Sequence, residues 1–415
     1  MPTIQVFEHE RLTIHKDDFG RVITSTQFEK LCQFNDNNDN KYYTVIRNGV
    51  KFANYVGVIQ IGNLTIEILP KADKVALTKE NQEGNINRWR KVLLKMLAIS
   101  GNLKIDSVSQ SFLKKRHNSL LELYFEIYLN EVSLLLRQGL VKKYRKDASN
   151  VKALKGRINF AKNIQQNLIH QERFFTIHQQ YDYEHLINQI LLKGLSVLKL
   201  LSNDDSIRSR VDKLRFTFPE IQEINIDQAS FVKINLNRKT ESYTEAIKIA
   251  KMLILNYSPD ISKGQDDMLA LLFDMNKLWE KYIYKRLKQG ENGNYTVSFQ
   301  ENQEFWENRI IKPDLVIVKD EETTIIDTKW RLAEPNKPSD GELKQMFAYN
   351  LNWDARKSIL LYPKVGKKVE EEFGKFHKGM KGVHLCKVGF VDVLNEEGEL
   401  NMEVADEVIN KIDVI

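Results

Sequence analysis

The sequence contains few of the residues and segments on which several classes of protein depend. Its 415 residues include two cysteines, Cys32 and Cys386, which lie far apart in the chain. Two cysteines cannot build a disulfide framework or a four-cysteine zinc or iron–sulfur site, so we expect a reducing compartment. No GxxxxGKS or GxxxxGKT segment occurs, so the chain lacks the standard loop that binds nucleotide phosphates.

Long apolar runs are also missing from the chain. The most apolar stretch, INQILLKGLSVLKLL, is interrupted by Lys193 and Lys199, whereas a membrane-spanning helix needs roughly 18 or more apolar residues. The N-terminal stretch MPTIQVFEHERL carries acidic residues early and has no apolar segment typical of a signal peptide. We therefore expect a cytoplasmic protein with no membrane partner.

The overall composition is that of an ordinary folded protein. Hydrophobic residues make up 42% of the chain and charged residues 28%, so disorder is not expected to dominate. A chain of 415 residues is long enough for roughly two or three domains, each with its own core. The net charge of +6 permits a polyanionic partner without requiring one.

Basic residues are concentrated between residues 142 and 157, where Asp147 is the single acid. Such a segment either follows the phosphates of a nucleic acid or forms a solvated helix end and loop, and charge alone does not separate the two. Gly156 permits a tight turn from which Arg157 would project, as an exposed probe or as part of a plain connector. The basic residues are Lys142, Lys143, Arg145, Lys146, Lys152, Lys155 and Arg157.

Residues 1–100 are predicted to form a β-rich N-terminal domain. In YVGVIQIGNLTIEILPK, Gly62 and Asn63 separate two β-branched runs, as in a hairpin with a two-residue turn, and Pro70 closes the second strand. The stretch NDNNDN, at residues 35–40, has the composition of a polar loop; it lacks the spaced ligands, the central glycine and the closing glutamate of a calcium loop.

Residues 101–257 are predicted to be mainly helical. Three segments, at residues 119–140, 185–200 and 243–257, repeat apolar residues at three and four positions, which is the period of a helix with one buried face. The polar stretch SPDISKGQDD, at residues 258–267, is the candidate linker.

Residues 268–415 are predicted to form a C-terminal α/β domain. A helix over MLALLFDMNKLWEKYIYKRLKQG is followed by the strand YTVSFQ, a hairpin, a helix around GELKQMFAYNL and the strand SILLYP. The expected fold class is therefore an α+β multidomain protein.

Two carboxylates interrupt the hairpin segment IKPDLVIVKDEETTIIDTKW, which otherwise reads as two buried strands joined at KDEE. Side chains alternate along a strand, so Asp327 and Lys329 share one face with Ile325. Asp314 lies on the neighbouring strand, where pairing brings it within reach of Asp327. Buried carboxylates that converge repel one another, and a divalent cation such as Mg²⁺ is the usual compensation.

This set of residues suits metal-assisted hydrolysis of a phosphodiester. The cation polarises a phosphoryl oxygen and activates water, while Lys329 stabilises the charge that develops on the phosphoryl group. Glu280, in the preceding helical segment LWEKYI, is the candidate third acid at the edge of the site, because its neighbours Trp279 and Ile283 would face the core.

The pattern of Pro313-Asp314 followed by Asp327-Thr328-Lys329 resembles the PD-(D/E)xK nuclease superfamily. Gln345 and Tyr349 follow on the next helix and resemble the QxxxY element of its RecB-like members, which lies near the site. The second acid is Asp327 where the superfamily commonly has glutamate, and either carboxylate binds Mg²⁺. The alternatives are a salt-bridged surface hairpin for the acids and an ordinary helix face for Gln345 and Tyr349.

Three ordered blocks, YVGVIQIGNLTIEILPK, GLVKKY with LKGRINF, and FDMNKLWEKYI, resemble the McrC family, the nuclease subunit of McrBC-type restriction systems. The resemblance implies that the regions before residue 257 dock on a hexameric McrB-like AAA+ GTPase and stimulate it. It also implies a C-terminal PD-(D/E)xK endonuclease that cuts double-stranded DNA with Mg²⁺. Carried over by motif, Asp314, Asp327 and Glu280 become metal ligands, Lys329 the catalytic lysine and Gln345 a further catalytic residue.

Two other functions are compatible with the same features. The chain is alternatively a non-catalytic activator of an AAA+ ring, against which the presence of Asp314, Asp327 and Lys329 together argues. The other alternative is a free-standing DNA repair nuclease of the RecB type, which leaves the N-terminal blocks unexplained.

Overall fold

The computed structural model describes residues 3–71, 81–101, 120–202, 204–258, 268–291, 293–331, 338–364, 372–376 and 383–413. The chain divides into two compact units. Unit 1 comprises Met1–Pro2, Gln60–Thr65 and Ile105–Leu271, and unit 2 comprises Thr3–Ile59, Ile66–Lys104 and Leu272–Ile415. Apart from Ser258, the candidate linker at residues 258–267 lies outside the described residues. None of the helices in the described ranges combines the length and apolarity that crossing a bilayer requires.

The N-terminal part of unit 2 is built mainly from strands. β1, β6 and β5 are neighbours in that order, and β2, β4 and β3 form a smaller sheet. The predicted hairpin is confirmed, because β5 and β6 flank Gly62, whose φ of +53° is the conformation that such a turn requires. The elements are β1 (Thr3–Phe7), β2 (Arg11–Thr13), α1 (Ser25–Asp36), β3 (Tyr43–Ile46), β4 (Gly49–Phe52), β5 (Tyr55–Ile61), β6 (Leu64–Leu69) and α2 (Gln82–Ile99).

Two features of this region differ from the prediction. Helices α1 and α2 were not expected among the strands, and α1 already includes the first residues of NDNNDN. The predicted helix at residues 268–290 is instead β11 (Met268–Asp274) followed by α10 (Met275–Gly290). The side chain of Asp274 accepts a hydrogen bond from the Asn276 backbone N–H at 3.0 Å and so caps α10 at this junction. A short apolar run such as MLALLF has no period that separates a buried strand from a helix.

Unit 1 contains the three predicted helices, which are confirmed with small changes at their ends. They are α4 (Leu120–Gln138), α6 (Leu186–Leu201) and α9 (Thr244–Asn256), and they pack with α7 (Asp205–Thr217) around a shared apolar core. The Tyr128 hydroxyl of α4 donates to the Leu191 carbonyl of α6 at 2.7 Å and packs against Gly194. Shorter elements are α8 (Gln228–Val232), the 3-10 turn η2 (Glu241–Tyr243) and β10 (Tyr257–Ser258).

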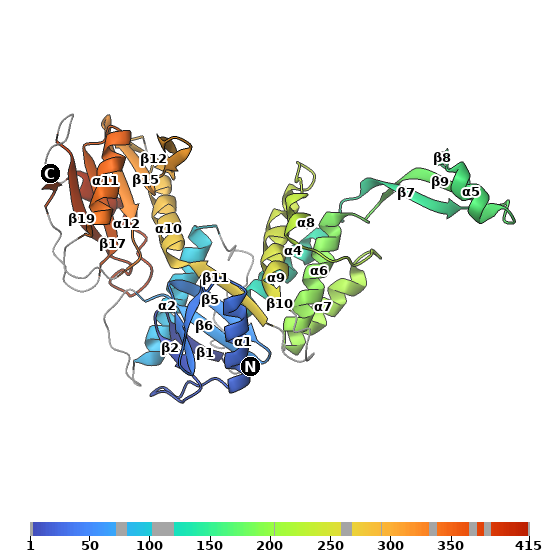
Figure 1. Cartoon of the computed structure of the whole chain (residues 1–415), viewed down its shortest axis with the longest axis horizontal. Helices are drawn as coiled ribbons and strands as arrows, with labels where there is room; N and C mark the ends of the chain where they lie inside the picture. Colours follow the sequence, from blue (N-terminus) through green and yellow to red (C-terminus); the bar gives the residue numbers. More distant parts are fainter. Residues whose placement is uncertain are drawn as a thin grey trace. The chain divides into compact units, whose positions relative to one another are not determined.

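A three-stranded sheet, which the sequence did not predict, interrupts the helices of unit 1. It has the order β7–β9–β8, with β7 (Lys143–Val151), β8 (Arg157–Ile158) and β9 (Phe174–Asp182), and α5 (Phe160–Asn167) lies against it. Figure 1 shows this arm extending away from the helices of the same unit. The basic segment is therefore largely a strand, and the alternative of a solvated helix end and loop is wrong for residues 143–151.

The C-terminal part of unit 2 is a mixed sheet of order β12–β15–β16–β17–β19–β18. β16 pairs antiparallel with β15 and parallel with β17, and the β15–β16 turn contains Asp320 and Glu321 at φ of 50° and 64°. Helix α11 covers the face to which Ile325 points, and Trp330 packs on Trp279 of α10, with ring centroids 5.2 Å apart. The elements are β12 (Tyr295–Phe299), β13 (Gln303–Trp306), β14 (Arg309–Ile311), β15 (Leu315–Lys319), β16 (Glu322–Thr328), α11 (Asp340–Asn352), β17 (Lys357–Pro363), β18 (Gly374–Lys375), β19 (Leu385–Val391) and α12 (Val404–Asp413).

Candidate active site

The two carboxylates of the hairpin lie at the same end of two neighbouring strands. Asp314 directly precedes β15, and Asp327 is the penultimate residue of β16. Because Leu315 pairs with Ile326, the register places Asp314 beside Asp327 at the edge of the paired region. The antiparallel hairpin thus brings together two acids that are 13 positions apart in the sequence.

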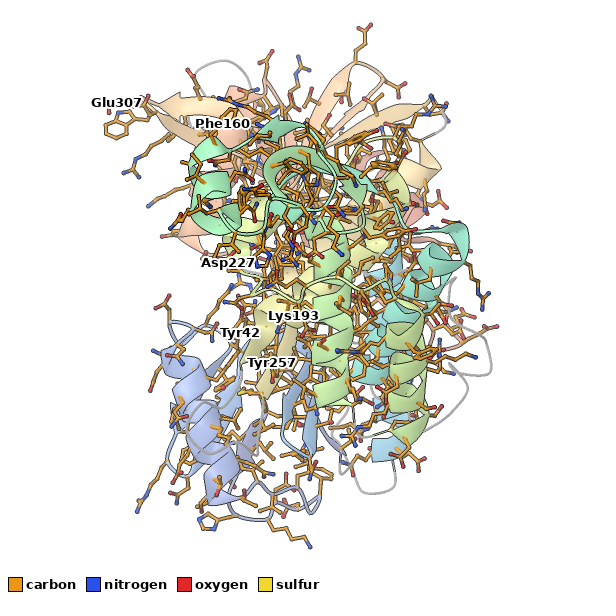
Figure 2. All side chains as sticks on the ribbon, turned by 90° about the vertical axis from the view of Figure 1, so that its right-hand side faces the viewer. Tyr42, Phe160, Lys193, Asp227, Tyr257 and Glu307 are labelled. Atoms are coloured by element: carbon orange, nitrogen blue, oxygen red, sulfur yellow. The ribbon has the colours of Figure 1, made fainter. Side chains whose placement is uncertain are left out.

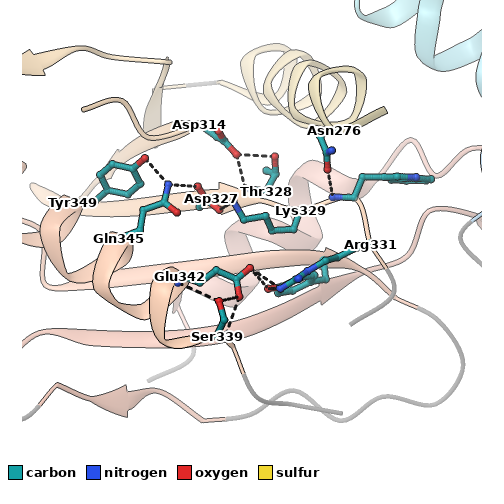
Figure 3. Close-up of polar contacts among 12 residues, drawn as sticks. Asn276, Asp314, Asp327, Thr328, Lys329, Arg331, Ser339, Glu342, Gln345 and Tyr349 are labelled. Carbon is teal, nitrogen blue, oxygen red and sulfur yellow. Dashed lines mark hydrogen bonds and ion pairs between the residues drawn. The ribbon is translucent and has the colours of Figure 1, made fainter. Parts of the chain in front are cut away.

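Side-chain contacts join these acids to Thr328 and Lys329 (Figure 3). Lys329 Nζ lies 2.6 Å from Asp327 Oδ2, so the prediction that Asp327 and Lys329 point the same way is confirmed. Asp314 Oδ2 accepts hydrogen bonds from the Thr328 backbone N–H at 2.7 Å and from Thr328 Oγ1 at 3.0 Å. Three residues of the predicted site are therefore in one place.

Burial and like charge both disfavour ionisation of the two aspartates. Asp327 is 2% exposed, and burial, with the nearby charge of Asp314, raises its pKa to about 6. Burial also raises the pKa of Asp314 to about 6, and the charge of Glu280 acts in the same direction. Burial acts to lower the pKa of Lys329, but the carboxylates around it outweigh burial and raise that pKa. Lys329 therefore stays protonated at neutral pH.

Glu280 is buried on α10 and is electrostatically linked to this pair. Its side chain accepts a hydrogen bond from Gln300, whose amide oxygen accepts in turn from Lys312 Nζ at 3.0 Å. Burial raises the pKa of Glu280, and the charge of Asp327 adds to the effect. Trp279 and Ile283 are fully buried, as predicted, and Glu280 is 7% exposed, more buried than an edge position suggested.

Gln345 and Tyr349 of α11 contact the site from the side of the helix. Gln345 Nε2 lies 3.4 Å from Asp327 Oδ1, and it donates to the Tyr349 hydroxyl at 2.8 Å. That hydroxyl donates to the Lys312 carbonyl at 3.0 Å. The spacing of four positions thus forms a hydrogen-bonded pair that reaches one of the aspartates.

Sequence reasoning missed an acid at the start of α11. Glu342 closes a capping box with Ser339, pairs with Arg331 at 2.6 Å and accepts from the Tyr362 hydroxyl at 3.1 Å. Its charge also contributes to the raised pKa of Lys329. The S-x-x-E spacing before the helix was the available signal for the cap, although the spacing does not reveal the proximity to Lys329.

The two aspartates are the candidate ligands for a hard divalent cation. In the ranges that the structure describes, no three acidic, histidine or cysteine side chains are close enough to hold a metal ion together. Asp314 and Asp327 nevertheless fit Mg²⁺, which usually keeps several waters and binds through one or two carboxylates together with substrate phosphates. The buried Oδ2 of Asp327 contacts Lys329 without hydrogen-bond geometry, so this oxygen retains capacity for a cation.

Comparison with known proteins gives matches in sequence and in fold. The family described as McrBC 5-methylcytosine restriction system component matches residues 50–363. The Escherichia coli (strain K12) type IV methyl-directed restriction enzyme EcoKMcrBC is 25% identical over 172 residues, which cover 40% of this chain and 49% of that protein. The match thus spans about half the length of this curated relative.

Two solved structures from Thermococcus gammatolerans are also similar. A chain of the half-complex from a tetradecameric assembly of McrB AAA+ hexamers with bound McrC aligns with a TM-score of 0.69 and 18% identity, covering 99% of this chain and 100% of that one. A chain of the McrBC complex aligns with a TM-score of 0.48 and 20% identity over 69% of this chain and 87% of that one. The family match covers most of the sequence, and it confirms the resemblance drawn from the three sequence blocks. The chain belongs to the family of McrBC 5-methylcytosine restriction system components.

Proposed function

We propose that this chain is the McrC-type nuclease subunit of a cytoplasmic restriction system, a Mg²⁺-dependent endonuclease with a PD-(D/E)xK site that cuts double-stranded DNA. The observation that carries the proposal is the convergence of Asp314, Asp327 and Lys329 at one edge of a sheet. Their buried, mutually repelling carboxylates make a site that gains from a cation, and perturbed pKa values of this kind are concentrated at functional sites.

In this proposal the residues of the chain have separate roles. Asp314 and Asp327 would hold Mg²⁺, and Glu280 would be the accessory acid. When bound, the ion would supply Lewis-acid polarisation of a phosphoryl oxygen and a lower pKa for water. Thr328 fixes Asp314 through two hydrogen bonds, and Gln345 orients Asp327 from α11. Lys329 moves from Asp327 toward the phosphate and stabilises the charge that develops there.

The partner in this proposal is a McrB-like AAA+ GTPase hexamer that the chain docks on and stimulates. McrC is bound to McrB AAA+ hexamers in the T. gammatolerans assembly. This sequence has no phosphate-binding loop of the GxxxxGKS or GxxxxGKT type, so another polypeptide would supply nucleotide hydrolysis. The arm of unit 1 suits docking, because α5 exposes apolar side chains to solvent. Phe160 of this helix is labelled in Figure 2. The exposed fractions are 71% for Phe160, 63% for Ile164 and 72% for Leu168, which directly follows α5.

Arg157 is the candidate residue of the arm for stimulation of the partner. It is exposed in β8, directly after Gly156, whose φ is +66°. No acidic side chain in the described ranges pairs with it. We expect Arg157→Ala to reduce stimulation of the partner GTPase while the two proteins still associate, measured as phosphate release and by size-exclusion chromatography. Unchanged stimulation would show that Arg157 is not a probe of the partner.

Plasmid cleavage tests the nuclease proposal. Supercoiled plasmid carrying candidate modified sites is incubated with the chain, the partner, nucleotide and Mg²⁺, and wild type is compared with Asp327→Ala. Cleavage by wild type alone supports the proposal. Equal stimulation of the partner by both forms, without cleavage by either, identifies a non-catalytic activator. Cleavage that needs neither partner nor nucleotide identifies a free-standing nuclease.

A further inference from the structure

A pocket of about 480 Å³ within unit 2 adjoins the candidate active site. Glu280 and Gln300 form part of its wall, and the Gln300 backbone N–H donates to the Asp314 carbonyl at 3.0 Å. A residue of the pocket wall is therefore hydrogen-bonded to the backbone of one of the two aspartates. Its volume lies in the range of small-molecule sites, roughly 300–1,000 Å³.

Lysines give this pocket a positive wall. Lys41, Lys277, Lys281 and Lys312 line it, and no acidic side chain in the described ranges lies within ion-pair distance of any of them. The two acids of the wall have other partners. Asp274 caps α10 and lies 3.4 Å from the Asn54 amide, and Glu280 is bound by Gln300. Lys312 donates to the Gln300 amide oxygen, but no ion pair in the described ranges neutralises the charge of these lysines, so an anionic ligand such as a phosphate group can bind them.

Aromatic rings form the other part of the wall. Tyr42 immediately precedes β3 (Figure 2), and its ring meets that of Tyr55 edge-on with centroids 5.0 Å apart. Lys41 Nζ lies 5.4 Å from the Tyr42 centroid and 5.7 Å from the Tyr55 centroid. Phe299, stacked on Tyr284 at 4.7 Å, lies in the same wall. Tyr42, Tyr55 and Phe299 are half-buried and line the pocket, and the ring of Tyr42 also stacks on Phe34 with centroids 5.8 Å apart.

Protein sites that bind single-stranded nucleic acid combine two elements, which are basic side chains and aromatic rings. The lysines follow the phosphates, and each ring offers a surface on which a base stacks. A base within a duplex has neighbours on both faces and cannot stack on such a ring, so the composition of this pocket suits an unpaired nucleotide.

We propose that this pocket binds an unpaired nucleotide of the DNA strand next to the phosphate that is cut, with Lys277, Lys281 and Lys312 on the phosphates and Tyr42 and Tyr55 on the base. The inference deepens the proposed nuclease function and rests on it for the identity of the ligand. The region that contains residues 41–55 was assigned to partner docking from the sequence. This proposal adds a role for these residues in binding substrate.

Binding of defined oligonucleotides to the full-length chain tests the pocket. Fluorescein-labelled oligothymidine and a labelled duplex are titrated by fluorescence anisotropy in buffer with chelator, so that no cleavage interferes. We expect the double variant Tyr42→Leu, Tyr55→Leu to bind oligothymidine about tenfold more weakly or worse, the loss typical of a stacked base. The variant Tyr42→Phe, Tyr55→Phe keeps the rings and is expected to bind as wild type does.

A lysine pair on α10 gives an independent test that leaves the aromatic wall intact. Lys277 lines the pocket, whereas Lys285, on the same helix, does not. For Lys277→Gln we expect the slope of log affinity against log salt to become shallower by about 0.7, the value for one phosphate contact of a single strand. Lys285→Gln is the matched control, and its slope should equal that of wild type.

Several outcomes overturn the proposal. The first is that wild type does not bind oligothymidine, and the second is that the Leu double variant binds it as tightly as wild type does. The third is that the Phe and Leu double variants lose the same affinity for oligothymidine. The fourth is that the Leu double variant loses as much affinity for the duplex as for oligothymidine. A Lys277→Gln slope equal to that of Lys285→Gln also overturns it. The nuclease function is judged separately. If wild type binds oligothymidine through the tyrosines but never cleaves plasmid, the nuclease function is refuted and the nucleotide pocket is kept. If wild type cleaves plasmid but its oligothymidine binding does not depend on the tyrosines, the pocket is refuted and the nuclease function is kept.

Discussion

The aspartate that we place at the metal site should destabilise the fold when no metal is bound. The pKa of Asp327 rises from 3.8 to about 6. Each pKa unit corresponds to 1.36 kcal/mol, so ionisation of Asp327 costs the folded state about 3 kcal/mol at neutral pH. Asp327→Asn removes this charge with little change of shape. The pKa of about 6 already includes the attraction of Lys329, so we expect the variant to be about 3 kcal/mol more stable than wild type near pH 7.5.

The pH dependence of this difference follows from the direction of the pKa change. Between the unfolded value of 3.8 and the folded value of about 6, the folded state holds a proton on Asp327 that the unfolded state has released. The stability of wild type therefore falls as pH rises through this window, and the penalty is complete above it. The advantage of Asp327→Asn should shrink as pH falls through the same window.

Urea denaturation in buffer with chelator, at about pH 5 and about pH 7.5, measures both effects. Asp320→Asn is the matched control, because Asp320 is exposed at the tip of the same hairpin. Excess Mg²⁺ should then stabilise wild type and not Asp327→Asn, since a ligand of the folded state adds to its stability. A variant that is no more stable than wild type at the higher pH, or an advantage independent of pH, would refute this account of the site.

Three further substitutions test the packing around the site and the arm. Tyr349→Phe removes the hydroxyl between Gln345 and the Lys312 carbonyl, and it should cost about 1 kcal/mol in urea denaturation; no loss would mean that this hydrogen-bonded pair is not formed. Gly156→Ala places a Cβ 2.5 Å from the Ile177 carbonyl at a φ of +66°, so it should destabilise the arm by about 1–2 kcal/mol, seen as faster amide exchange in β9; unchanged exchange would contradict the turn. Gly194→Ala puts a methyl group into the Tyr128 ring and should lower unfolding stability by about 1–3 kcal/mol in thermal denaturation, whereas an unchanged melting temperature would contradict the close packing of α4 on α6.

The hairpin and its carboxylates were predictable because their signals are local. Alternation along β16 fixes the shared direction of Asp327 and Lys329, and the polar tip KDEE marks the turn. The pairing of β15 with β16 then follows from their adjacency, which brings Asp314 to Asp327 without knowledge of the rest of the fold.

The arm was not predictable by the same reasoning. KYRKDASNV, the sequence of β7, has few apolar residues, so no hydrophobic period marks it as a strand. Its strand conformation depends on pairing with β9, which begins 23 positions after β7 ends. A pattern read from neighbouring residues does not contain that long-range information.

The contacts that surround the aspartates depend on tertiary structure. Glu342 approaches Lys329 because α11 packs on β16, and Tyr42 shares a pocket with Lys277 although more than 200 positions separate them. The sequence shows each residue type but not their common location. Glu342 and the pocket residues Tyr42 and Lys277 were therefore missed, whereas Glu280 and Gln345 were found through the family resemblance and the acids of the hairpin through local pattern.

The most direct test of the central claim is anomalous diffraction from crystals of this chain soaked in Mn²⁺, a hard divalent ion that takes the oxygen ligands of Mg²⁺. The account predicts anomalous density in contact with both Asp314 and Asp327, with Lys329 Nζ displaced from Asp327, and no such density in Asp327→Asn. Density confined to other places, with the ion pair between Lys329 and Asp327 intact in wild type, would contradict it.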